Sequence, residues 1–100
     1  MMTYFQLDLF TDMKNLLRAK SNLYGRTQEL VHHDNHIDMA FPHKGGIFYV
    51  NSNNGFTVLE DGTEIASVSN RLLLFNPSEP HHSTSCTDVK RRVNINFNYL

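Results

Sequence analysis

The sequence predicts a mainly β domain with one amphipathic helix at its N-terminal end. After about residue 20, short β-prone runs follow one another closely, separated by residues rich in Asn, Gly, Asp and Pro. Before that point, apolar residues recur at helical spacing instead. Many short strands after a single helix are typical of a β-sandwich or a closed β-sheet with the helix packed outside.

The helix is expected within residues 5–20, and it should end near Lys20. Thr11 or Asp12 can cap its first turn. The apolar side chains that give the helical spacing are Phe10, Met13, Leu16 and Leu17. A single helix of this length covers only part of a sheet.

Seven runs carry the β-prone residues. They are residues 21–27, 29–34, 45–51, 55–60, 63–69, 71–77 and 91–100. The residues between them are those that tight turns need, and Glu60-Asp61-Gly62-Thr63 predicts a hairpin between two of the runs. With 100 residues and no repeat or linker, the chain is expected to form one domain over residues 1–100.

Composition narrows the function classes. Hydrophobic residues make up 40% and charged residues 19%, as in folded globular proteins. The net charge of −1 gives no overall positive field for nucleic acid, although residues 89–92 (VKRR) form a local basic cluster. The sequence begins with no signal-peptide pattern and has no membrane-spanning apolar run. Cys86 is the only cysteine, so no internal disulfide can form and a reducing, cytoplasmic setting is expected.

A histidine and a carboxylate lie two residues apart at His36 and Asp38. In a strand, both side chains would point to the same side and could reach one ion. The segment EPHHSTSC offers His81 or His82 as a third ligand. Two histidines and one carboxylate on one side of an ion form the facial triad of non-haem Fe(II) oxygenases. The run HHD at residues 32–34 repeats a similar pattern, so the pair alone is weak evidence.

The last expected strand has one polar and one apolar face. Its polar positions are Arg92, Asn94, Asn96 and Asn98, and its apolar positions are Val93, Ile95 and Phe97. One interpretation is a half-buried strand with a solvated polar face. The other is a buried arginine whose planar fork binds a small dicarboxylate through two parallel hydrogen bonds. Tyr49 could add a phenol hydrogen bond to the same carboxylate.

Taken in order, four segments resemble the Fe(II)/2-oxoglutarate-dependent dioxygenases, in particular the prolyl-4-hydroxylase-like branch of phage and bacteria. The segments are HID, IFYVNSNNGFTVLEDGT, NRLLLFNPSEPHHST and RRVNINFNYL. They resemble a His-x-Asp motif, a Tyr-x-Asn strand followed by Gly and Thr, a strand leading to the distal histidine, and a closing arginine strand. The resemblance runs from about Ser21 to the end and implies a double-stranded β-helix (jelly roll) with one N-terminal helix packed on the sheet.

The resemblance implies that His36, Asp38 and His81 bind Fe(II) and form the catalytic centre, with His82 as the alternate to His81. The neighbouring histidines leave this ambiguity of one residue. Relatives that end in a similar His-x-Ser-Thr pattern favour His81.

The resemblance also implies a pocket for the co-substrate 2-oxoglutarate. Arg92 would hold its distal carboxylate with Tyr49 assisting, and Arg91 is the alternate arginine. Strand polarity favours Arg92, because that residue shares its face with Asn94. Asn94 and Tyr24 are expected beside the co-substrate, and packing in the core is the alternative role for Tyr24.

The expected activity is hydroxylation of a C–H bond in a peptidyl (prolyl-like) or other substrate, with succinate and CO2 as co-products. Fe(II) and 2-oxoglutarate would be required, and ascorbate would serve as an auxiliary reductant. The expected partner is a peptide or small-molecule substrate, and neither nucleic acid nor a membrane is indicated. The expected location is the cytoplasm of a bacterium or of an infected host cell.

Relatives usually have a longer N-terminal region whose helices brace the sheet, so part of that region is expected to be missing here. This difference leaves two alternatives open. One is a catalytically inactive cupin-like or jelly-roll binding module. The other is an oxygenase that acts on a nucleic-acid base or a small molecule.

Overall fold

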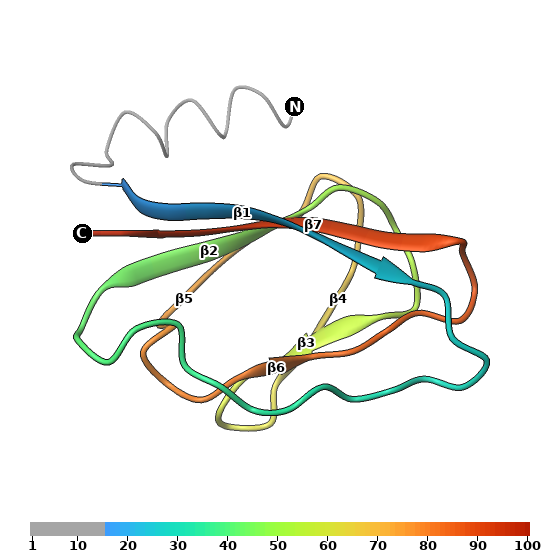
Figure 1. Ribbon diagram of the computed structural model, residues 1–100, viewed down its shortest axis with the longest axis horizontal. Helices are drawn as coiled ribbons and strands as arrows, with labels where there is room; N and C mark the ends of the chain where they lie inside the picture. The colour runs from blue at the N-terminus through green and yellow to red at the C-terminus, as the bar shows by residue number, and fades with distance from the viewer. Residues whose placement is uncertain (1–15) are drawn as a thin grey trace.

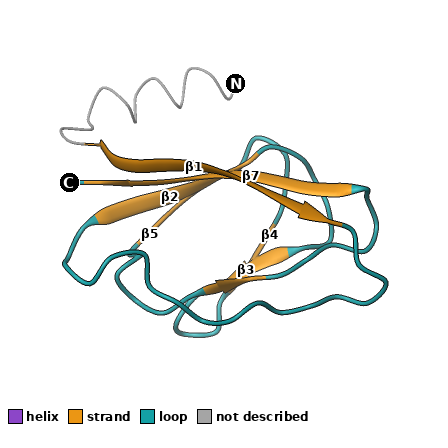
Figure 2. Cartoon of the chain, viewed as in Figure 1, coloured by secondary structure: helices purple, strands orange, loops and turns teal. Residues whose placement is uncertain are grey.

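The structure is a computed structural model that describes residues 16–100, and the regular elements of this part of the chain are strands (Figure 2). Seven strands form two antiparallel sheets. The strands are β1 (Leu16–Gly25), β2 (Lys44–Tyr49), β3 (Phe56–Val58), β4 (Glu64–Ala66), β5 (Leu72–Phe75), β6 (His82–Ser83) and β7 (Arg91–Tyr99). No helix within residues 16–100 is long and apolar enough to cross a membrane.

The two sheets lie face to face as the layers of a jelly roll (Figure 1). The larger sheet has the strand order β1-β7-β2-β5, and the smaller has the order β4-β3-β6. Strands that are far apart in the sequence are therefore hydrogen-bonded neighbours, as in β1 beside β7. The predicted mainly β, jelly-roll fold class is confirmed.

The predicted helix is wrong over residues 16–20, which form the first half of β1. The rest of that prediction falls on residues 1–15, outside the described part of the chain. Leu16 and Leu17 gave the helical spacing, but their exposed fractions are 52% and 37%, so they form no buried helix face. Pairing with β7 decides the conformation instead, because it satisfies the backbone of β1 along nearly its whole length.

The strand expected over residues 29–34 is also wrong. This segment is irregular and has one isolated bridge, between His32 and Thr84. Its run of histidines and aspartate has no apolar alternation that could bury one face. Each of the other predicted runs contains a strand.

The predicted hairpin is confirmed between β3 and β4, where Val58 lies opposite Glu64. The backbone N–H of Leu59 donates to the carbonyl of Thr63 at 2.9 Å. Gly62 lies in this turn with φ +88°, a conformation that other residues adopt only with strain.

The inner face of β7 is polar and largely buried. Arg92, Asn94 and Asn98 of β7 have exposed fractions of 0%, 3% and 0%, whereas Arg91 is exposed. Alternation along β7 places Val93 and Ile95 on the outer face, where they are half-buried. The solvated-face interpretation of β7 is therefore wrong, and the jelly roll encloses polar side chains that need partners.

Candidate metal centre

Two histidines from distant parts of the chain lie directly opposite each other. His36 and His81 form an isolated antiparallel bridge. The backbone N–H of His36 donates to the carbonyl of His81 at 2.9 Å, and the return bond measures 3.0 Å. In such a pair the two side chains lie on the same side of the backbones. Their ring centroids are 4.5 Å apart as a result.

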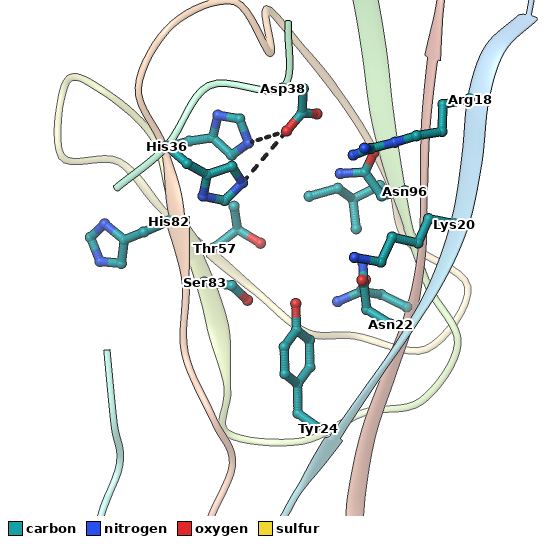
Figure 3. A pocket seen from close by; sticks show the side chains of 13 residues that line it. Arg18, Lys20, Asn22, Tyr24, His36, Asp38, Thr57, His82, Ser83 and Asn96 are labelled. Atoms are coloured by element: carbon teal, nitrogen blue, oxygen red, sulfur yellow. Dashed lines mark hydrogen bonds and ion pairs between the residues drawn. The ribbon is translucent and has the colours of Figure 1, made fainter. Parts of the chain in front are cut away.

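Asp38 completes the group from a bend two residues after the bridge. Its backbone N–H donates to the carbonyl of Pro77 at 3.0 Å, which fixes the turn of the chain. Its Oδ1 lies 3.5 Å from Nε2 of His36 and 3.4 Å from Nε2 of His81 (Figure 3). Within residues 16–100, these three residues are the only group of His, Cys, Asp or Glu close enough to share an ion, with ligand atoms within 4.8 Å of one another.

The backbone around the two histidines selects their tautomers. Nδ1 of His81 lies 2.9 Å from the carbonyl of Glu79, and Nδ1 of His36 lies 3.3 Å from the carbonyl of Asp34. A carbonyl only accepts, so each Nδ1 carries the proton and donates it. The Nε2 atoms that face Asp38 are then unprotonated in the neutral rings. This arrangement is typical of histidines that ligate a metal through Nε2.

The group therefore brings three acceptors together. Oδ2 of Asp38 and Nε2 of His81 are buried and have no hydrogen-bond partner in the described part of the chain. Two nitrogen lone pairs and a carboxylate repel one another unless a cation lies between them. A proton on one histidine meets that need, and so does a metal ion, so the residues fit a divalent metal.

The pKa values of Asp38 and His81 reflect the same need for a cation between them. Burial opposes ionisation of Asp38, but contact with His81 and the nearby His36 outweighs it and lowers the pKa of Asp38. Burial would also lower the pKa of His81, yet Asp38 and the Glu79 carbonyl raise it overall. Without metal, the structure thus favours a proton held between His81 and Asp38.

His82 has a different environment from His81. Its Nδ1 is 2.6 Å from Oδ1 of Asn35, and its Nε2 is 3.0 Å from Nδ1 of His32. Burial, and after it the charges of the surrounding histidines, lowers the pKa of His82. Its side chain lines the neighbouring cavity but does not join the three-residue group.

A cavity of about 170 Å³ lies beside the candidate metal group (Figure 3). One wall comes from the inner faces of β1, β2 and β7, and the other from the metal group with β3 and β6. The side chains of the first wall are Arg18, Lys20, Asn22, Tyr24, Ile47, Asn94 and Asn96. The predicted residues Tyr24 and Asn94 are thus brought to the cavity together with His36, Asp38 and His81.

Arg92 lies between the two sheets but does not line the cavity. Its Nε donates to Oγ of Ser67 at 3.1 Å, and its Nη1 donates to Oγ of Ser83 at 2.7 Å. Its Nη2 is buried without a hydrogen-bond partner among the described residues. The ring of Tyr24, which does line the cavity, has its centroid 5.2 Å from the guanidinium carbon. Arg92 therefore keeps the N–H groups of Nη2 unused, next to a residue that lines the cavity.

Tyr49 also lies between the two sheets without lining the cavity. Its hydroxyl is hydrogen-bonded to Oγ1 of Thr57 at 2.7 Å, and Thr57 lines the cavity. Burial raises the pKa of Tyr49, although the bond to Thr57 and the charge of Arg92 oppose the shift. Asn94 is held on the wall by Asn22, whose Nδ2 donates to its Oδ1 at 3.0 Å.

Arg18 and Lys20 are cavity residues that the sequence prediction missed. In the predicted helix, Arg18 and Lys20 would not share a strand face with Tyr24. The signal that could have found them is the alternation Arg18, Lys20, Asn22, Tyr24, which continues one strand face. Both cations point toward the cavity from the side opposite the metal group (Figure 3).

The fold has counterparts among solved structures. A prolyl-4-hydroxylase from Pseudomonas putida is 16% identical, with a TM-score of 0.58 over 97% of this chain. The match covers 59% of the hydroxylase, so the chain spans little more than half of that protein. An RmlC-like cupin from Desulfovibrio desulfuricans is 14% identical, with a TM-score of 0.51 over 80% of this chain and 81% of the cupin.

Comparison at the sequence level gives nothing further. No protein-family model matches the chain, and no curated protein matches it significantly. At 16% and 14% identity, the structural likenesses establish the fold. The chain has a jelly-roll fold of the kind found in this prolyl-4-hydroxylase and this cupin, and it carries a candidate His-Asp-His metal centre beside a polar cavity.

Proposed function

We propose that the protein is an Fe(II)- and 2-oxoglutarate-dependent dioxygenase that hydroxylates a C–H bond of a peptidyl, prolyl-like substrate. The observation that carries the proposal is the meeting of two histidine nitrogens with one carboxylate, whose buried Oδ2 has no hydrogen-bond partner among the described residues. Two histidines and one carboxylate occupy one side of a metal and leave the other positions open, which suits Fe(II) and its co-substrates. When bound, the iron and 2-oxoglutarate supply the oxidising chemistry, with succinate and CO2 as co-products.

In this proposal, three side chains of the protein would hold the metal. His36, Asp38 and His81 hold the metal, and the Nδ1 hydrogen bonds of the histidines keep Nε2 directed at it. The metal takes the place of the proton that would otherwise separate Asp38 from His81. Backbone pairing thus brings His36 opposite His81 without help from the metal.

Arg92 supplies the charge for the distal carboxylate of 2-oxoglutarate. Ser67 and Ser83 fix two of its nitrogens, so Nη2 is the donor left to use. A buried donor without a partner is unfavourable, and a carboxylate would remove that penalty. Tyr24 and Asn94 contact the co-substrate from the wall, and Tyr49 assists by holding the hydroxyl of Thr57 toward the cavity.

A binding module without redox chemistry is the second candidate. The cupin likeness supports it, because that match covers most of both chains, whereas the hydroxylase match covers 59% of the hydroxylase. In this candidate the metal group is structural and the cavity holds a ligand that is not oxidised.

Calorimetric titration of 2-oxoglutarate into anaerobic, Fe(II)-loaded protein tests the proposal. We expect binding, followed by slow succinate formation when oxygen and ascorbate are added. Arg92→Gln should abolish binding, and Arg91→Gln, its exposed neighbour, should bind 2-oxoglutarate as the unaltered protein does. Absence of 2-oxoglutarate binding to the iron-loaded protein would reject the dioxygenase and favour the binding module.

A further inference from the structure

We infer that Arg18 and Lys20 form a recognition site for a carboxylate of the prime substrate, and that this substrate is an acidic peptide. The inference rests on the proposed function and adds the substrate class to it. Neither the metal group nor the residues proposed for 2-oxoglutarate include these two cations.

The fold places both cations on the wall of the cavity. Arg18 and Lys20 share the inner face of β1 with Asn22 and Tyr24. In the register of the larger sheet, Arg18 lies opposite Asn98 and Lys20 lies opposite Asn96. An edge strand, β1, thus brings two positive charges to the rim of a polar cavity. Figure 3 shows them across that cavity from His36 and Asp38.

No described residue neutralises these cations. Within residues 16–100, the side chains of Arg18 and Lys20 have neither a hydrogen bond nor an ion pair. Among the described residues, Asp38 is the only carboxylate on the cavity wall, and its Oδ1 faces His36 and His81 instead. Two like charges directed into one concave site create a positive potential that attracts an anion.

With Fe(II) and 2-oxoglutarate bound, the charges of the site leave the prime substrate as the anion that Arg18 and Lys20 attract. The two positive charges of Fe(II) and the one of Arg92 are balanced by Asp38 and the two carboxylates of 2-oxoglutarate. Arg18 and Lys20 then remain, and each can pair with a carboxylate. Because they lie across the cavity from His36 and Asp38, a substrate held by them would lie between β1 and the candidate metal ligands.

Size and charge favour a peptide over a polynucleotide. The cavity of about 170 Å³ is smaller than typical ligand pockets, so most of a large substrate must stay outside it. A polynucleotide carries a phosphate at every step and binds through many cations. This chain has a net charge of −1, and two cavity cations suit one or two acidic side chains.

Matched peptides test the inference with the full chain, Fe(II), 2-oxoglutarate and ascorbate. One peptide has a proline between two glutamates, and the other has the same proline between two glutamines. We expect the glutamate peptide to gain one oxygen atom by mass and to have the lower KM, by roughly threefold to tenfold. The double variant Arg18→Gln/Lys20→Gln should remove that difference by raising KM with kcat unchanged, since the cations bind the substrate uniformly.

A control variant and a binding measurement distinguish failure of the inference from failure of the proposed function. Lys90→Gln removes an exposed positive charge that does not line the cavity and should leave both KM values unchanged. The double variant should bind 2-oxoglutarate as tightly as the unaltered protein does.

Five outcomes would overturn the inference. If the double variant loses about tenfold or more in 2-oxoglutarate affinity, the two cations hold the co-substrate, and the dioxygenase proposal stands. Equal KM values for the two peptides, or turnover of neither, reject the acidic peptide. Succinate formation stimulated by an alkylated oligonucleotide instead would assign the cations to phosphate. If the unaltered protein binds no 2-oxoglutarate, the proposed function fails first and the inference with it.

Discussion

His36 and His81 face Asp38 at nearly equal distances, yet their side chains are 53% and 4% exposed. The buried histidine has no alternative partner for its Nε2, whereas the exposed one can turn toward water. His81 and Asp38 therefore form the fixed part of the group, and His36 closes it from the solvent side.

His81→Ala should abolish Fe(II) binding, because it removes a buried ligand that the backbone already orients. Even outer-shell substitutions typically cost 10–100-fold in metal affinity, so the expected loss is larger than about a hundredfold. Anaerobic titration with Fe(II), followed by calorimetry, measures it. The matched control is His82→Ala, which should bind Fe(II) normally; the reverse pattern would move the ligand by one residue.

Fe(II) affinity should fall as the pH is lowered through the raised pKa of His81. In the metal-free protein, the pKa of His81 is raised, so its stabilising protonation is present below that pKa and lost as pH rises. The pKa of Asp38 is lowered, so its contribution is lost only as pH falls through that lower value. Between the two values a proton occupies the pair, and metal binding must release it.

Calorimetric affinities measured at several pH values test this competition. Each proton released should change the apparent affinity by about tenfold per pH unit in this range. His82→Ala should leave the profile in place, since His82 is not in the metal group. A pH-independent affinity would contradict the assigned competition.

At the level of the elements, the sequence predicted that His36 and Asp38 lie close together, but not which backbone contacts bring them together. The spacing of His36 and Asp38 did predict that they meet, but through strand alternation. In the structure the two are brought together by a bridge to His81 and a bend held by Pro77. Such long-range backbone pairing has no local pattern in the sequence.

Strand β1 is the element that sequence patterning misassigned. Apolar spacing around Leu16 and Leu17 favoured a helix, and tertiary pairing with β7 overrode it. The error hid Arg18 and Lys20, which belong to the cavity only when the strand face is continued backward from Tyr24. By contrast, β7 was predicted well, because its polar alternation is unbroken.

Gly55→Ala should destabilise the fold through Arg92. A Cβ at Gly55 would lie 2.5 Å from Cδ and 2.6 Å from Nε of Arg92, and 2.6 Å from the backbone carbonyl of Ser85. The guanidinium must shift, which breaks its bonds to the serines. We expect a loss of about 1–3 kcal/mol in the free energy of unfolding, measured by urea denaturation. The same variant should bind 2-oxoglutarate more weakly.

Gly25→Ala is the matched control at the end of β1, where a Cβ would meet no atom within 4 Å. Its free energy of unfolding should change by no more than about 0.5 kcal/mol. Equal effects of the two substitutions would show that Gly55 is not packed against Arg92 as described.

At the scale of the whole molecule, metal binding should stabilise the fold and protect the segment over residues 26–43. Among the backbone bonds that attach this segment to the rest of the chain are those donated by Thr27, His33, His36 and Asp38. At a free Fe(II) concentration one hundred times Kd, the gain is about 2.7 kcal/mol. Anaerobic thermal unfolding and limited proteolysis measure the two effects.

His36→Ala distinguishes Fe(II) binding at the candidate metal centre from a non-specific effect of the salt on stability. It should remove most of the metal-dependent rise in Tm and leave the segment cleavable with or without Fe(II). Protection of the segment in this variant equal to that in the unaltered protein would show that the metal binds elsewhere.

The bridge between His36 and His81 also has a consequence for the order of events during synthesis. Two of the three candidate ligands lie before β2, and the third lies just before β6. A nascent chain whose His81 is still inside the ribosome therefore holds only two of the three candidate ligands. The full set exists only after His81 has emerged and paired with His36, so iron loading is expected late in folding and not at its start.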